Sequence, residues 1–67
     1  MFKLTIKTGN AAFHDEDENG DHQAAAMLEC ARILREAANR LECGSDCESL
    51  RDYNGNKVGD FILELEG

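Results

Sequence analysis

The feature that most constrains the fold of this chain is a change in its hydrophobic period, from two to about 3.6 residues and back. Residues 2–8 alternate between apolar and polar side chains, with Phe2, Leu4 and Ile6 on one side, which predicts a half-buried strand. Residues 21–43 carry apolar side chains every three or four positions and are rich in alanine, which predicts a helix. A chain of 67 residues that devotes about a third of its length to one helix has room for only a few strands.

The predicted helix has recognisable ends and two distinct faces. Asp21 is expected to cap its start, and Gly44 is expected to terminate it. One side carries charges at spacings that allow ion pairs, namely Glu29, Arg32, Glu36 and Arg40. The side expected to face the sheet is formed by Met27, Cys30, Ala31, Leu34, Ala37, Ala38 and Leu41.

The residues after the helix predict a hairpin over residues 49–66. Asn54 and Gly55 lie between two extended segments, and both tolerate the positive φ of a type I′ turn. The acidic and amide side chains of residues 52–56 superficially resemble a metal loop, but turn chemistry accounts for them without a metal. The last strand is indicated by Phe61, Leu63 and Leu65, which alternate with their neighbours.

These elements predict an α+β fold with the order β-α-β-β, in which one helix packs on a three-stranded antiparallel sheet. We expect the last strand to lie in the middle of the sheet. The whole chain, residues 1–67, forms one domain, since a chain of this length has a single thin core. A deep substrate pocket is not expected, because a cavity of roughly 300 Å³ or more would consume most of that core.

The loop expected at residues 14–21 concentrates the negative charge of the chain. Its five acidic residues supply five of the seven net negative charges, with no lysine or arginine among them. An acidic balance repels nucleic acid and anionic membranes, and it suits a basic protein surface. Net charge alone fits a role in solubility equally well. The acidic residues of the loop are Asp15, Glu16, Asp17, Glu18 and Asp21.

Part of this loop resembles the calcium loop of EF-hands. Asp15, Asp17, Asn19 and Gly20 match positions 1, 3, 5 and 6 of that loop. Position 12, which requires a bidentate glutamate, is Ala26, and the predicted element before the loop is a strand. We therefore expect no metal and no cofactor. A weak calcium site with Asp15, Asp17 and Asn19 as ligands is the alternative.

The remaining reactive side chains do not form a catalytic signature. Cys30, Cys43 and Cys47 are expected to be reduced thiols, and together with His14 and His22 they lack the paired spacing of a zinc site. No nucleophile, base and orienting group are recognisable together, so we expect the protein not to be an enzyme. The seven basic residues are too few and too interspersed along the chain to predict a nucleic-acid patch.

Three segments together resemble a family of very small acidic phage and prophage proteins. They are residues 8–13 (TGNAAF), 31–42 (ARILREAANRLE) and 50–59 (LRDYNGNKVG). The shared residues look like fold determinants and imply no catalytic residue. Proteins of this size and shape also resemble anti-CRISPR proteins in style, several of which offer carboxylates to a surface that otherwise holds DNA.

The resemblance implies a phage-encoded stoichiometric inhibitor of a host nucleic-acid-binding defence complex, with a CRISPR–Cas effector as the favoured partner. One alternative is a small phage accessory protein that binds a host or phage replication or transcription protein; another is a weak calcium-binding module. We expect no direct contact with nucleic acid or membrane. The residues expected to bind the partner are Asp15, Glu16, Asp17, Glu18, Asp21, Glu64 and Glu66.

The distribution of apolar and charged residues predicts the location and the oligomeric state of the protein. The first residues lead into the alternating segment and not into an apolar leader, and no apolar run approaches the ~20 residues of a membrane span. We therefore expect the protein in the cytoplasm of the bacterial host. Outward-facing Lys3, Lys7 and Arg51 discourage pairing of the sheet edges, so we expect a monomer.

Overall fold

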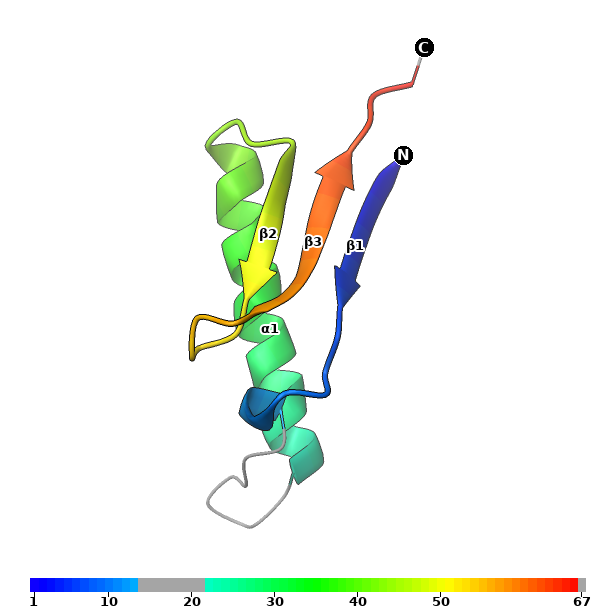
Figure 1. Ribbon diagram of the computed structural model, residues 1–67. Helices are drawn as coiled ribbons and strands as arrows, with labels where there is room; N and C mark the ends of the chain where they lie inside the picture. Colours follow the sequence, from blue (N-terminus) through cyan, green and yellow to red (C-terminus); the bar gives the residue numbers. More distant parts are fainter. Residues whose placement is uncertain (14–21, 67) are drawn as a thin grey trace.

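A computed structural model describes residues 1–13 and 22–66, and it confirms the predicted β-α-β-β order (Figure 1). A 21-residue helix stands behind a small sheet, and a 3₁₀ turn lies earlier in the chain. The elements are β1 (Phe2–Ile6), η1 (Ala11–Phe13), α1 (His22–Glu42), β2 (Cys47–Arg51) and β3 (Lys57–Leu63).

The sheet has the strand order β1-β3-β2, and both pairs are antiparallel. The prediction that the last strand is central is therefore confirmed. Phe61 of β3 lies opposite Leu4 of β1 and Glu48 of β2, so it occupies the middle of the inner face. β3 ends at Leu63, and Leu65, which was predicted to continue the strand, lies beyond it and is 90% exposed.

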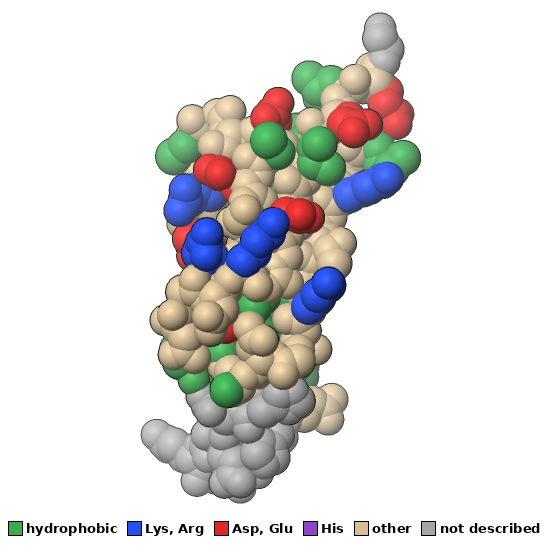
Figure 2. Space-filling model, in the orientation of Figure 1, with side chains coloured by type: hydrophobic (Ala, Val, Ile, Leu, Met, Phe, Trp, Pro, Cys, Tyr) green, Lys and Arg blue, Asp and Glu red, His purple; other side chains and the backbone are tan. Residues whose placement is uncertain are grey.

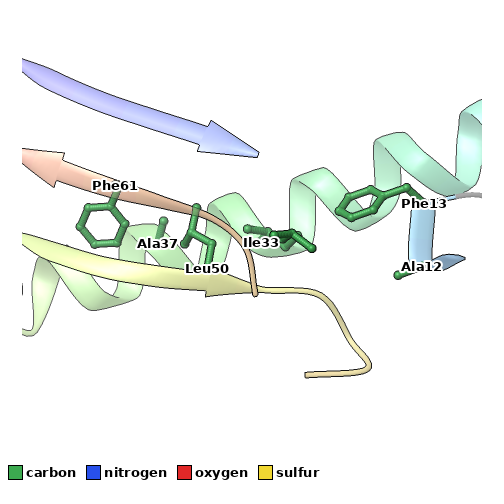
Figure 3. Close-up of a cluster of buried hydrophobic side chains, with 7 residues drawn as sticks. Ala12, Phe13, Ile33, Ala37, Leu50 and Phe61 are labelled. Atoms are coloured by element: carbon green, nitrogen blue, oxygen red, sulfur yellow. The ribbon is translucent and has the colours of Figure 1, made fainter. Parts of the chain in front are cut away.

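α1 packs against β2, η1 and the centre of β3, and the core lies along this contact (Figure 3). Ile33 is fully buried and Ala37 nearly so, between Phe13 on one side and Phe61 on the other. The small side chain of Ala37 allows the helix to lie close to the sheet. Leu50 of β2 completes the inner surface of this contact. The core is therefore a single row of side chains.

The rotation of α1 about its axis differs from the predicted one. Met27 and Leu34, predicted to face the sheet, are 64% and 49% exposed, whereas Glu29, predicted to face solvent, is only 7% exposed. The core is centred on Ile33 and Ala37, roughly 80° around the helix axis from the centre of the predicted face. A nearly continuous apolar arc made this rotation ambiguous in the sequence.

Both predicted chain reversals occur, but one has a different geometry. Gly44 ends α1 with φ of 99°, and the N–H of Ser45 donates to the carbonyl of Arg40, as in a Schellman motif. In the hairpin turn, Gly55 has φ of 86° whereas Asn54 does not have a positive φ, so the predicted type I′ turn is wrong. The Asp52 carboxylate accepts hydrogen bonds from the backbone of this turn and fixes the alternative geometry.

Gly59 allows β1 and β3 to approach each other, and this predicts a strong effect of substitution. A Cβ at this position would lie 1.8 Å from the carbonyl oxygen of Thr5. We expect Gly59→Ala to lower the free energy of unfolding by at least about 1–3 kcal/mol, measured by urea titration. Gly9→Ala is the control, because a Cβ there has no heavy atom within 4 Å. Equal effects of the two substitutions would contradict this account of the sheet.

Candidate interaction surfaces

The acidic residues Asp15, Glu16, Asp17, Glu18 and Asp21 lie outside the described residues, and so do the candidate calcium ligands Asp15, Asp17 and Asn19. The described residues on either side of this segment belong to the fold. Phe13 is 1% exposed within the core, and His22 is the first residue of α1. The chain therefore enters the acidic segment from a buried side chain and leaves it into the helix.

The other two predicted partner-binding residues, Glu64 and Glu66, lie at the opposite end of the molecule from His22 (Figure 1). The N-terminal ammonium group donates a hydrogen bond to the carbonyl of Glu64 and lies 3.3 Å from Oε1 of Glu66. A helix of 21 residues is about 31 Å long, and the C-terminal tail lies beyond its far end. The two parts of the predicted binding surface are thus attached to the fold at opposite ends of α1.

The end of the molecule near the C-terminus is itself acidic. Figure 2 shows carboxylate side chains gathered at this end, where Asp46 and the tail meet. The backbone N–H of Leu63 donates to the carbonyl of Asp46 at 2.7 Å, which joins the end of β3 to the start of β2. The negative charge of Asp46 is the main cause that raises the pKa of the Cys47 thiol above its usual value. Cys47 is exposed, but this environment disfavours its nucleophilic thiolate form.

The outer face of the sheet is basic, which the sequence analysis did not predict. Lys3 pairs with Ile62, and Arg51 pairs with Lys57, on the side of the sheet away from α1. Lys7 and Lys57 line one open depression together with Asp60. Figure 2 shows lysine and arginine side chains spread over this face, with a carboxylate among them. These four cations are separated by up to 54 positions along the chain (57 − 3). The antiparallel register therefore gathers basic residues that look interspersed in the sequence.

A buried carboxylate links α1 to the hairpin. Glu29 receives two hydrogen bonds from Arg32, at 2.6 Å from Nε and 3.1 Å from Nη2, and a third from the backbone N–H of Tyr53 at 2.8 Å. Arg32 also donates to the carbonyl of Arg51 at 3.1 Å. The hydrogen bond with Glu29 raises the pKa of Arg32 further above its usual value. A buried charge requires such partners, and they explain why Glu29 can lie inside.

A second buried carboxylate, Asp52, organises the turn. Its Oδ1 accepts hydrogen bonds from the backbone N–H groups of Asn54 and Asn56, at 3.0 and 2.9 Å. Its Oδ2 accepts from the side-chain amides of Asn10 and Asn56, at 3.1 and 3.4 Å. Burial by itself raises the pKa of Asp52, but these hydrogen bonds outweigh burial and lower the pKa below its usual value. The carboxylate thus has a structural role, in agreement with turn chemistry.

The lowered pKa of Asp52 predicts a dependence of stability on pH. A carboxyl group whose pKa is lower in the folded state stabilises the fold above its unfolded pKa of about 3.9, and this contribution is lost as the pH falls through the folded value. We expect Asp52→Asn to lower the urea midpoint at neutral pH, because an amide nitrogen would then face the donors of Asn10 and Asn56. The difference from the unsubstituted protein should shrink below about pH 4. Asp60→Asn, on the exposed face, is the control, and a pH-independent difference for Asp52→Asn would contradict this role.

The depressions found among the described residues are shallow features of the sheet surface. The two main depressions are open and lie on the outer face of the sheet, one of them lined by Cys47, Ser49 and Ile62. No three histidine, cysteine or acidic side chains in residues 1–13 and 23–66 are grouped so that they could hold a metal ion. The three cysteines in this part are free thiols, and Cys30 is half-buried against the core. His14 and the side chain of His22 lie outside the described part.

Comparison with known proteins adds no functional assignment. No family model matches the chain, and no curated protein or solved structure is significantly similar to it. Within the described residues, no helix is both long and apolar enough to cross a membrane. The function must therefore be argued from the surfaces described above.

Proposed function

We propose that the protein is a phage-encoded, stoichiometric inhibitor that binds the basic nucleic-acid-binding surface of a host defence complex, with a CRISPR–Cas effector as the favoured partner. One observation carries this proposal: five carboxylates fall within seven consecutive residues, between the buried anchor Phe13 and the first turn of α1.

The proposed mechanism is electrostatic and needs no catalytic residue. A groove that holds DNA is lined by cations, and carboxylates that enter it replace phosphates as their counterions. Opposite charges also accelerate the encounter of the two proteins, and this effect weakens as salt screens it. The same interaction occupies the site that the nucleic acid would use, so inhibition is competitive and stoichiometric.

The basic face of the sheet supports a defined orientation for this complex. Lys3, Lys7, Arg51 and Lys57 would be repelled by a basic groove, so the outer face of the sheet is turned away from the partner. The acidic segment is attracted to the basic groove and the basic face is repelled by it. The protein is therefore expected to bind in one orientation. A uniformly acidic protein would have no such preferred orientation.

The proposal predicts that binding to the partner depends on where the negative charges lie in the protein, and not only on its total charge. The partner is first identified by capture from lysate of the host and mass spectrometry, where a CRISPR effector is expected. The triple substitution Asp15→Asn, Glu16→Gln, Asp17→Asn should then weaken competition with a DNA duplex for that effector by about tenfold or more. The matched control Glu42→Gln, Asp46→Asn, Asp60→Asn removes the same three charges and should change competition by less than about twofold. Equal losses for the two variants, or no loss for the first, would refute the mechanism.

The basic face of the sheet favours one alternative, an accessory protein that joins a replication or transcription complex. Four cations on one face suit a partner that carries acidic segments, or nucleic acid already held by that partner. The same capture experiment separates the two functions, because polymerase or replisome subunits would then be recovered. In that case Lys3→Gln and Lys57→Gln would weaken the interaction, whereas neutralising residues 15–17 would not.

A further inference from the structure

α1 carries a second apolar stripe besides the one that faces the core. Along this stripe the spacing alternates between three and four residues, which is the heptad pattern of helices that pair with other helices. Met27 and Leu34 on the stripe are 64% and 49% exposed, and the adjacent Leu28 is 67% exposed. The stripe consists of Ala24, Met27, Ala31, Leu34, Ala38 and Leu41.

The stripe lies on the flank of α1 that points away from β2. The opposite flank is polar and contacts β2 and its turn, through Arg40 with Glu48 at 3.3 Å and Arg32 with the carbonyl of Arg51 at 3.1 Å. Among the described elements α1 packs against β2 and η1, and β1 lies on the other side of the central strand β3. On the uncovered side, Phe2 of β1 remains 45% exposed although it points toward the inner face. The apolar flank of α1 and the inner side of β1 therefore lie next to each other without a covering element among the described residues.

The stripe is complementary to itself about the midpoint of α1. If a second α1 lies antiparallel, with a two-fold axis between Arg32 and Ile33, position i faces position 65 − i of the other copy. Each contact layer then sets one alanine against one large side chain, and layers of this kind fill the space evenly. The two central layers are Met27 with Ala38 and Ala31 with Leu34. The end layer is Ala24 with Leu41, whose side chain also packs partly against the core of its own copy. A parallel pair would instead stack alanine on alanine and leave gaps.

We propose that this stripe is a homodimer interface, in which α1 packs antiparallel against α1 of a second copy of the chain. The large apolar side chains on and beside the stripe, Met27, Leu28 and Leu34, are 64%, 67% and 49% exposed, and a standard interface buries ~800 Å² on each partner. Contiguous exposed apolar side chains of this kind often mark an interaction site. The sequence-based prediction of a monomer rests on lysine and arginine residues that discourage pairing at the strand edges. Those residues have no bearing on this flank of the helix.

The net charge of the protein determines how the dimer depends on salt. Each copy has a net charge of −7, so two copies repel each other, and moderate salt should strengthen the association. The inference stands independently of the proposed function. A dimer would carry two acidic segments, and it would bind a target with two basic sites more tightly than a single copy does.

Sedimentation equilibrium of the full chain tests the association. The mass should rise with concentration from 7.4 kDa toward twice that value, and more readily in moderate salt. Leu34→Glu should weaken the dimer by about tenfold or more, because it places a charge in the central layer. Leu65→Glu is the matched control, since Leu65 is 90% exposed outside the stripe, and it should change the dissociation constant by less than about threefold. Circular dichroism checks that both variants are folded; if Leu34→Glu is not, Ala38→Glu replaces it.

Cross-linking tests the antiparallel arrangement. In a background with Cys30→Ala, Cys43→Ser and Cys47→Ser, copies carrying Met27→Cys are mixed with copies carrying Ala38→Cys and oxidised. The antiparallel dimer predicts a disulfide between the two different copies. Two thiols at position 27 would be offset by about 16 Å along the helices, too far for a bond. A monomer at all concentrations, equal weakening by both glutamate variants, or dominant bonds between identical copies would overturn the proposal.

Discussion

The structure depends on one geometric constraint: a single helix covers only two strands of a three-stranded sheet. α1 packs toward the β2 side of the sheet, and β1 lies on the other side of the central strand β3. The helix packs against β2 and the centre of β3, and the core consists of the side chains in that contact, including Ile33, Ala37 and Phe61. This placement of α1 leaves the inner side of β1 half-covered, and it leaves one apolar flank of the helix exposed. Both the polar contacts and the candidate dimer interface follow from this placement.

The polar contacts lie on the covered side and hold the helix there. Glu29 and Asp52 are both buried, and each accepts hydrogen bonds from the turn between β2 and β3. Glu29 also pairs with Arg32, so its charge is compensated within the helix. Because a buried carboxylate without partners is strongly unfavourable, these contacts favour one rotation of α1 over its neighbours. The small core is thus supplemented by a specific polar network.

The sequence predicted the elements and the topology, because they depend on local periodicity and on turn residues such as Gly44 and Gly55. It did not predict the rotation of α1, since the apolar arc of the helix is wide enough for two stripes, and Ile33 and Leu34 are equally apolar neighbours. The burial of Glu29 and Asp52 was missed because it depends on partners distant in sequence, such as Tyr53 and Asn10. The basic face was missed for the same reason: the register of the sheet gathers Lys3 and Lys57. The acidic partner-binding residues 15–18 and 21 remain a prediction from the sequence.

The central claim is that α1 has two apolar contact faces. One packs on the sheet, and the other pairs with a second copy of the chain. Isotope-filtered nuclear Overhauser measurements test this claim most directly, in a sample that mixes labelled and unlabelled protein. The account predicts contacts between copies from the Met27 methyl group to the Ala38 methyl group, with Ile33 contacting only residues of its own copy. Contacts between copies that involve Ile33, or none at all at millimolar concentration, would contradict it.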